Sequence, residues 1–496
     1  MSRYIPILTA LFCATSSMLA ADSQPILNDH MGVATHFSHK TGWMNPWDAS
    51  RHIPMIAEMG VGWIRDEIVW RDVEPVRGEY RISENTREWI ELAHANGLKV
   101  IACFADHNPI YEDAWDAEAY ARAAAWLAKE LDGRIQAIEV LNEPFGSVSF
   151  TGGPPHNNWT GLDPDRSLSP WLARYVKLLN TAAVAIKAAN PRMKVIGLGG
   201  TTPQNYRQLA MGISIDVDGI TDHPYSFRSP PEVIPHRDIP SYVEKVGFAV
   251  ADSDGSFASF VGMYREELKK QHGPAQLWFT ESGWSTFREG EKKRTFLYSG
   301  VNEAAQARYS QRRFMEALAL GVTVNIQYDF LDDSGHTGGD FEAERFFGLV
   351  RADGSPKPAY HAVQSVARAT IGFTSGCDIK AKVFPFSDRT EDRPRIWDGD
   401  PLPALSRIML YPFSDVAGRP VFAVWSAERP SDQSVRSADL EFAVDPGKFY
   451  VEATDLMTGE VSQPATKLLG GRLMVEQFAV PDYPVLIRLL PRVSGK

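Results

Sequence analysis

Two glutamates in this chain each stand where an apolar run ends. Glu143 comes after the mainly apolar run 137–141 and just before Pro144, and Glu281 follows the mainly apolar run 277–280. Runs of this kind are typical of buried strands, so both carboxyl groups are predicted at strand ends. Cleavage of a sugar acetal requires two carboxyl groups, one that gives a proton and one that acts as nucleophile or base. The pair therefore points to chemistry at a glycosidic bond.

The segment between about residues 30 and 370 alternates short apolar runs with patterns of helical spacing. Eight strands are predicted, at residues 32–37, 61–65, 99–104, 135–141, 194–198, 218–221, 277–280 and 322–326. The runs are continuous, as expected for strands buried on both faces. Eight strands that are each followed by a helix predict an α/β fold, the (β/α)8 TIM barrel. A doubly wound open sheet is the alternative, but no glycine-rich dinucleotide motif follows the first strand.

The composition changes near residue 373, where the helical patterns stop. Short runs typical of strands, such as residues 421–425, 440–444 and 485–490, are separated there by Gly, Pro, Asp and Ser. They predict a small C-terminal β-sandwich. The predicted organisation is a catalytic barrel over residues 22–372 and a β-sandwich accessory domain over residues 373–496.

The N-terminal residues have the pattern of a secretory signal peptide. Arg3 supplies a positive charge, residues 5–19 are apolar, and Ala20 and Ala21 offer a cleavage site. Residues 1–21 are therefore predicted to be removed. The apolar stretch is short for a membrane span, although an uncleaved anchor or a buried helix is the alternative interpretation. We expect a secreted or periplasmic protein with no membrane span in the mature chain.

Composition and cysteine usage exclude several classes of protein. The 496 residues have a formal net charge of −11, which argues against nucleic acid as a partner. Cys103 and Cys377 lie far apart in the chain and make neither a disulfide framework nor a zinc site. The predicted fifth strand supplies no metal-binding His or Asp, and no strand end offers the lysine of a Schiff-base aldolase. The sequence thus predicts no metal and no cofactor.

In a (β/α)8 barrel the chemistry lies at the carboxyl ends of the strands. The polar residues predicted at that end are His36, Arg65, Asp66, Glu67, Asp106, His107, Asn108, Asn142, Glu143, His223, Tyr225, Glu281, Tyr328 and Asp329. His36, His107 and His223 each have two possible roles: the ring contacts the sugar, or it orients a neighbouring side chain.

Aromatic residues and long loops near these strand ends are the candidates for shaping a cleft. Trp284, three residues after Glu281, is the best candidate among the tryptophans for stacking on a sugar ring. Residues 146–170 and 226–255 form two long loops after the fourth and sixth predicted strands. Loops of this length in a compact domain usually carry function, so we expect both to contribute to the cleft.

Three motifs occur together, and they are Asn142-Glu143-Pro144, His223-Pro224-Tyr225 and the strand-borne Glu281. Their order and spacing resemble clan A of the glycoside hydrolases. The details, including residues 347–360, are most similar to glycoside hydrolase family 39 and its family 5 relatives. The resemblance covers roughly residues 30–370.

The resemblance implies a role for each matching residue. Glu143 matches the general acid/base, and Glu281 matches the nucleophile. Asn142 matches the amide that hydrogen-bonds the sugar 2-hydroxyl. Tyr225 and Arg65 match groups that hold the nucleophile ionised, since a neighbouring positive charge favours a carboxylate.

Together these features predict a secreted, retaining glycosidase that needs no cofactor and cleaves a poly- or oligosaccharide by double displacement. A transglycosylase acting at the same site, or a non-catalytic carbohydrate-binding barrel, is the alternative. The separation of the two carboxyl groups distinguishes retention from inversion, and this distance depends on the fold.

Overall fold

The structure is a computed structural model that describes residues 26–39, 47–152, 159–227, 229–287, 300–333, 343–386, 407–430 and 435–492. The predicted signal peptide, residues 1–21, lies outside the described residues. Within the described ranges, no helix is both long enough and apolar enough to cross a membrane.

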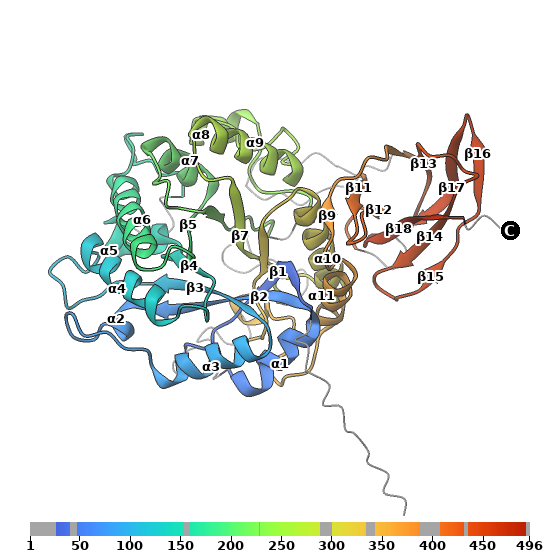
Figure 1. The fold of residues 1–496 in the computed structure, drawn as a ribbon. Coiled ribbons are helices and arrows are strands. Elements are labelled where there is room, and N and C mark those ends of the chain that lie inside the picture. The colour runs from blue at the N-terminus through green and yellow to red at the C-terminus, as the bar shows by residue number, and fades with distance from the viewer. Residues whose placement is uncertain are drawn as a thin grey trace, which may run out of the picture.

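Eight parallel strands close into a barrel in chain order, with the helices arranged around it (Figure 1). The strands are β1 (Asn28–Ala34), β2 (Val61–Val69), β3 (Lys99–Ala105), β4 (Ala137–Val140), β5 (Lys194–Gly200), β6 (Gly219–Asp222), β7 (Gln276–Ser282) and β8 (Val324–Gln327). The first strand pairs with both β2 and β8, which closes the barrel. The predicted (β/α)8 fold is confirmed.

Helices follow every strand. The longer ones are α1 (Ala49–Met59), α3 (Glu84–Ala95), α4 (Ala117–Glu130), α6 (Pro170–Ala189), α7 (Thr202–Met211), α9 (Phe257–Lys270), α10 (Glu303–Ala319) and α11 (Pro358–Ala369). Shorter ones are α2 (Trp70–Val73), α5 (Val148–Thr151) and α8 (Pro240–Val246). Side chains that accept from backbone N–H groups begin several of them: Asp48 caps α1 and Ser83 caps α3. Gly60 ends α1 with φ of 89°, a backbone conformation that glycine adopts without strain.

The predicted positions of the first and last strands differ from the structure. The first strand was expected at residues 32–37 but ends at Ala34, so His36 lies just beyond it. The last was expected at residues 322–326 but spans Val324–Gln327. Both runs were assigned by hydropathy, which does not report which residues pair with a neighbouring strand.

The inside of the barrel changes from apolar to charged along the strand direction. Near the amino ends, Trp63 and Trp278 meet edge to face at 5.4 Å within a buried apolar cluster. Side chains alternate along a strand, so the residue two positions after Trp63, which is Arg65, faces the same interior. Arg65 reaches Glu139 and Glu281 there. The apolar layer thus forms the floor beneath a buried group of charges.

Two antiparallel sheets follow the barrel. One has the order β10-β13-β17-β16 and the other β15-β14-β18-β12-β11-β9. Their strands are β9 (Thr374–Ser375), β10 (Ala381–Pro385), β11 (Ile408–Ser414), β12 (Pro420–Ser426), β13 (Arg436–Phe442), β14 (Phe449–Asp455), β15 (Val461–Ser462), β16 (Thr466–Leu469), β17 (Arg472–Val480) and β18 (Val485–Pro491). A buried apolar cluster lies between them, which agrees with the predicted β-sandwich.

The β-sandwich is attached to the barrel through helix α10. Arg312 of this helix is fully buried and donates to the backbone oxygens of Glu428 and Asp482. Its guanidinium also pairs with Glu232, which lies in the loop between β6 and α9. Trp425 of β12 donates to the same carboxylate at 2.7 Å. The accessory domain is therefore joined through buried polar contacts to a loop at the catalytic end of the barrel.

Candidate active site

Glu143 lies three residues beyond the end of β4 and has an unusual backbone. Its φ is 38° and its ψ is 58°, and Pro144 then begins a short 3-10 helix over Pro144–Gly146. A left-handed conformation is uncommon for a residue other than glycine, and the ring of a following proline restricts it further. Strained conformations of this kind gather at functional sites. The side chain of Glu143 is 34% exposed, so it is open to a ligand.

Glu281 lies in β7 and is only 10% exposed. One of its oxygens accepts from the guanidinium of Arg65 at 2.8 Å, and the other accepts from the hydroxyl of Tyr225 at 2.8 Å. Burial raises the pKa of Glu281, whereas the charges of His223 and Arg65 favour its ionised form. The net direction of the pKa shift is upward, and the effect of burial on this carboxyl group is opposed by the charges of His223 and Arg65.

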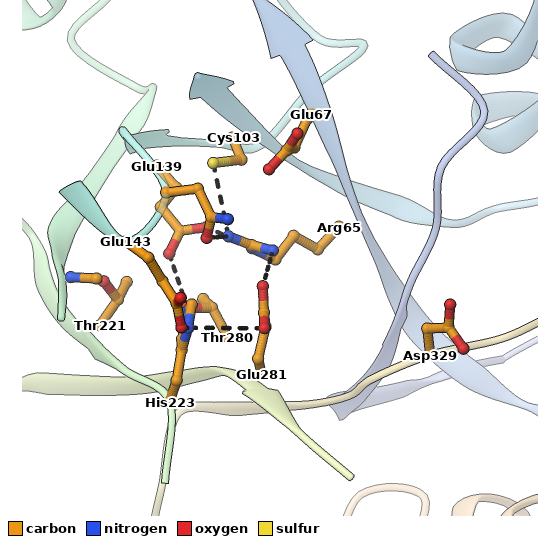
Figure 2. A network of polar contacts seen from close by, with 12 residues as sticks. Arg65, Glu67, Cys103, Glu139, Glu143, Thr221, His223, Thr280, Glu281 and Asp329 are labelled. Atoms are coloured by element: carbon orange, nitrogen blue, oxygen red, sulfur yellow. Dashed lines mark hydrogen bonds and ion pairs between the residues drawn. The ribbon is translucent and has the colours of Figure 1, made fainter. Parts of the chain in front are cut away.

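Arg65 occupies the centre of the site and connects several strands (Figure 2). Its side chain is 4% exposed and also donates to the carboxylate of Glu139 in β4 and to the side-chain oxygen of Asn142 at 2.9 Å. The neighbouring Asp66 is engaged elsewhere, because it accepts from Thr35 at 2.7 Å. The resemblance had implied the contact between Arg65 and Glu281, and the structure places the two side chains together.

His223, at the end of β6, lies between the two glutamates (Figure 2). Its Nδ1 is 2.8 Å from Glu143 and 3.7 Å from Glu281, and its Nε2 is 3.1 Å from the hydroxyl of Thr280. Burial lowers the pKa of this imidazole, but the carboxylates of Glu281 and Glu143 outweigh burial and raise it to about 9. His223 therefore orients a carboxylate.

The two carboxyl groups are close together. One atom each of Glu143, His223 and Glu281 lies within 4.8 Å of the others. Retaining glycosidases hold their carboxyl groups about 5 to 5.5 Å apart, and inverting ones about 6.5 to 9.5 Å apart. One oxygen of Glu143 thus lies within 4.8 Å of one oxygen of Glu281, a close approach that agrees with the spacing of retaining enzymes.

The same three side chains offer ligand atoms at a spacing that could hold a metal ion. Arg65 and Tyr225 already occupy both oxygens of Glu281, however, and Nδ1 of His223 faces Glu143. The donors around Glu281 thus serve to hold a carboxylate, which is what a nucleophile needs.

Two cavities meet at Glu143. The first, here called the polar hollow, has a volume of about 370 Å³. Its lining consists of Ala34, Thr35, His36, His39, Arg65, Asp66, Glu67, Asn142, Glu143, Tyr225, Glu281, Tyr328, Glu344 and Phe347. The second, the apolar hollow, has a volume of about 330 Å³. Its lining consists of Glu143, Phe145, Trp159, Gly200, Thr201, Thr202, Asp222, His223, Pro224, Tyr225, Phe227, Ile234, Pro235, His236 and Phe260. Only Glu143 and Tyr225 belong to both.

Most of the predicted site residues gather at these cavities. His36 lines the polar hollow, where burial lowers the pKa of its ring to about 3, so the ring is neutral near pH 7. His107 lies at the same end of the barrel but lines neither hollow; its ring pairs with Asp106 and packs at 5.4 Å from Trp115. His107 therefore lies outside the walls of both hollows.

The prediction that Trp284 stacks on a sugar is wrong. Its side chain is 1% exposed, and its ring packs 5.3 Å from Tyr309 of helix α10. Its indole N–H donates to the backbone oxygen of Ser229 at 3.1 Å. Nearness to Glu281 in the chain did not place it in the cleft, because the backbone after β7 turns this ring towards α10 and away from the cavity. Trp284 instead supports the loop that follows β6.

Sequence reasoning missed Glu139 and the pair formed by His39 and Glu67. Glu139 is completely buried in β4, and the hydroxyl of Thr280 donates to it at 2.7 Å. A charged residue inside an apolar run, four positions before Glu143, was the signal that could have revealed it. His39 and Glu67 are 3.1 Å apart in the wall of the polar hollow, and nothing in their spacing along the chain indicates that contact.

A closed barrel with two carboxyl groups close together at its carboxyl end is the arrangement expected of a glycoside hydrolase. Residues 19–230 match the family model described as cellulase, glycosyl hydrolase family 5. This range includes Arg65, Asn142, Glu143, His223 and Tyr225. A search of curated protein sequences finds no significant match.

Several solved structures have the same fold at low identity. A family 39 glycoside hydrolase from Bacteroides cellulosilyticus matches with a TM-score of 0.63 and 19% identity, over 94% of this chain and 81% of that one. A monomeric beta-xylosidase from Caulobacter crescentus matches with a TM-score of 0.53 and 14% identity, over 95% and 98% of the two chains. The catalytic domain of a family 30 xylanase from Talaromyces cellulolyticus matches with a TM-score of 0.52 and 13% identity, over 94% and 97%.

The family match, the barrel and the carboxylate pair agree with one another. The chain is a glycoside hydrolase of clan A, the clan that the three motifs had indicated. Enzymes of this clan act with retention at the anomeric carbon.

Proposed function

We propose that this protein cleaves an O-glycosidic bond by double displacement, with Glu143 as general acid/base and Glu281 as nucleophile. The observation that carries the proposal is the short separation of two carboxyl groups with unlike surroundings. The oxygens of Glu281 are bonded to Arg65 and Tyr225, whereas Glu143 is 34% exposed and faces His223. The guanidinium beside Glu281 favours the ionised form that a nucleophile needs, and the more open side chain of Glu143 is accessible to a leaving group.

In the first step, an oxygen of Glu281 attacks the anomeric carbon, and the bond from that carbon to the leaving oxygen breaks. Glu143 gives its proton to the leaving oxygen, which departs as an alcohol. The product is a glycosyl ester of Glu281. In the second step, Glu143 takes a proton from water, and the water oxygen attacks the anomeric carbon and releases Glu281.

The surrounding side chains serve these two steps. Arg65 holds Glu281 and Asn142 at once, so it fixes the nucleophile relative to the amide predicted to bind the sugar 2-hydroxyl. Loss of the negative charge of Glu281 on forming the ester favours an ionised Glu143, which the second step needs. Each step uses side chains of the chain itself, so no cofactor enters the scheme.

The stereochemical course tests the proposal. Proton NMR during the first minutes of hydrolysis of an aryl glycoside should show a product with the anomeric configuration of the substrate. Inversion would overturn the assignment of Glu281 as nucleophile, because a single displacement leaves no glycosyl-enzyme. A sugar acceptor added in excess tests the alternative function: a glycoside as the main product would make the protein a transglycosylase.

A poly- or oligosaccharide substrate and export from the cytoplasm belong to the same proposal. Export is supported by the pattern of Arg3, the apolar residues 5–19, and Ala20 and Ala21. N-terminal sequencing of the protein recovered from the producing cells should begin at Asp22, and a chain that still begins at Met1 would contradict removal of a signal peptide.

A further inference from the structure

The apolar hollow adjoins the catalytic carboxylates on the side of the acid/base. Glu281, Arg65 and Asn142 line the polar hollow and not the apolar one, whereas Glu143 lines both. In double displacement the nucleophile faces the sugar that it attacks, and the acid faces the leaving group. The polar hollow therefore lies where the attacked sugar must sit, and the apolar hollow lies where the leaving group departs.

The wall of the apolar hollow consists largely of rings and aliphatic groups. Its apolar members come from both long loops and from the segments beside them: Phe145, Trp159, Pro224, Phe227, Ile234, Pro235 and Phe260. Trp159 stacks on His236, with ring centres 5.9 Å apart and planes at 10°. Burial lowers the pKa of His236 to about 4, so this pair presents neutral aromatic rings at neutral pH.

Several polar groups in this wall are already bonded within the protein, whereas Nδ1 of His236 has no hydrogen-bond partner among the described residues. The hydroxyl of Thr202 donates to Asp222 at 2.9 Å, and the amide of Asn205 donates to the same carboxylate at 3.2 Å. The hydroxyl of Thr201 donates to the backbone oxygen of Trp159. A second sugar has hydroxyl groups around its whole edge and needs partners for them on burial, even where one face stacks on an aromatic ring.

The polar hollow has the opposite character. His39 and Glu67 form a pair in its wall at 3.1 Å, and Asn142 and Glu344 also line it. These groups suit the hydroxyls of a sugar. Because the guanidinium of Arg65 is already bonded to Glu139, Glu281 and Asn142, it is poorly placed to receive a further acidic group, and the attacked sugar is expected to be neutral.

We propose that the apolar hollow is the leaving-group site and that it takes an aromatic or aliphatic aglycone, so that the preferred substrate is a neutral sugar linked to an apolar alcohol. The inference rests on the proposed function and narrows its substrate from a poly- or oligosaccharide to a glycoside of this kind. A cavity of about 330 Å³ with an apolar wall has the size and lining of sites for small apolar groups.

The test compares two aliphatic alcohols of similar acidity but different apolar length, with a disaccharide as the polar alternative. The glycone is chosen first, from the α- and β-4-nitrophenyl glycosides of glucose, xylose, mannose and galactose. It is the sugar and anomer whose 4-nitrophenyl glycoside the enzyme hydrolyses fastest. The kcat/KM is then measured for the n-hexyl glycoside, the methyl glycoside and a disaccharide of that glycone. We expect the hexyl glycoside to exceed both of the others by about tenfold or more, since several methylene groups are buried. Equal values for hexyl and methyl, or the highest value for the disaccharide, would overturn the inference.

A pair of tryptophan variants locates the effect. Trp159→Ala should lower the hexyl-to-methyl ratio of kcat/KM about fivefold or more, because it removes a ring from the wall of the hollow. Trp126→Ala is the matched control: Trp126 is half-buried and stacks on Tyr80 at 5.5 Å, but lines neither hollow. The ratio should stay at the wild-type value in this control. A ratio that is unchanged in Trp159→Ala as well would contradict the placement.

A binding measurement separates failure of this inference from failure of the proposed function. Calorimetric titration of Glu281→Gln with the hexyl and methyl glycosides reports the hollow without turnover. If the wild-type protein binds the hexyl glycoside more tightly than the methyl glycoside but hydrolyses no glycoside, the proposed function is refuted. The assignment of the apolar hollow as a binding site for apolar groups then stands. Hydrolysis with no preference in binding or in kcat/KM would refute the apolar site and keep the proposed function.

Discussion

The two hollows beside Glu143 are similar in volume and opposite in chemistry. The polar hollow is lined by charged pairs such as His39 with Glu67 and Arg65 with Glu281. The apolar hollow is lined by rings and prolines, and the hydroxyls of Thr201 and Thr202 in its wall are already bonded within the protein. The difference indicates that one end of the substrate is recognised by hydrogen bonds and the other by removal of apolar surface from water.

The largest expected effect is in the polar hollow. Glu281→Gln should lower kcat on an aryl glycoside by about 10⁴-fold or more, because an amide cannot attack the anomeric carbon and removing a nucleophile costs orders of magnitude. Initial rates from 4-nitrophenol release measure the change. Glu118→Gln changes an exposed glutamate on α4 in the same way and should keep the wild-type rate. Equal rates for wild type and Glu281→Gln would end the hydrolase interpretation.

Arg65, in the wall of the polar hollow, should also matter for the stability of the folded protein. Arg65→Met leaves the carboxylates of Glu139 and Glu281 buried without their positive partner, and breaking buried pairs costs about 3 to 5 kcal/mol. The free energy of unfolding from urea denaturation should fall by about that amount. Arg87→Met removes a half-exposed arginine paired with Glu130 and should cost less than about 1 kcal/mol. Losses of the same size in both variants would contradict the central position of Arg65.

The apolar hollow depends on a different ion pair. Glu232 precedes Ile234 and Pro235 in the wall, and Arg312 and Trp425 hold its carboxylate. Glu232→Gln should cost about 3 kcal/mol in unfolding free energy, because Arg312 loses a buried partner. It should also lower the hexyl-to-methyl ratio of kcat/KM.

The control for Glu232 is a surface pair across the same two regions. Arg407, next to β11, is half-exposed and pairs with Asp254 of the loop before α9 at 2.8 Å. Asp254→Asn should change the unfolding free energy by less than about 1 kcal/mol. Its hexyl-to-methyl ratio of kcat/KM should equal that of the wild type. If Glu232→Gln has the wild-type hexyl-to-methyl ratio of kcat/KM, the β-sandwich does not support the apolar hollow.

A dependence of stability on pH is also expected at the junction of the hollows. The pKa of His223 is raised to about 9 by Glu281 and Glu143, against an ordinary value of 6.5. A raised pKa means that protonated His223 stabilises the folded state fully below about pH 6.5 and that this contribution is lost as pH rises through about 9. The contribution is roughly 3 kcal/mol.

Urea denaturation at pH 6 and at pH 9.5 measures this contribution. The wild type should lose more stability between the two values than His223→Gln, which carries no titrating ring. Parallel losses in the two proteins would show that the contacts of His223 with Glu143 and Glu281 do not raise its pKa.

Much of the fold was readable from local pattern. Continuous apolar runs alternating with helical spacing predicted eight strands, and the strand-end rule then pointed to Glu143, Glu281 and Arg65. Strand ends were wrong by a few residues, as with His36, because pairing partners lie far away in the chain. Glu139 went unnoticed because its neighbours are apolar, and its partners come from β2 and β7.

Trp284 shows where nearness along the chain misleads. It follows Glu281 by three residues, yet its ring lies against α10 and supports Ser229. The tryptophan that lines the apolar hollow is Trp159, from a different loop. The direction in which an aromatic side chain points from a loop depends on packing against elements that are distant in the sequence. Local hydropathy does not contain this information.

The amino-acid sequence by itself determined the barrel, the pair of glutamates and their clan, because periodicity, chain breakers and short motifs are local properties. Only the tertiary structure decided the short distance between Glu143 and Glu281, the charge centre at Arg65 and the contrast between the hollows. These features join side chains from β2, β4, β6, β7 and the long loops. Their separations are set by closure of the barrel, a cooperative property of all eight strands that no single segment contains.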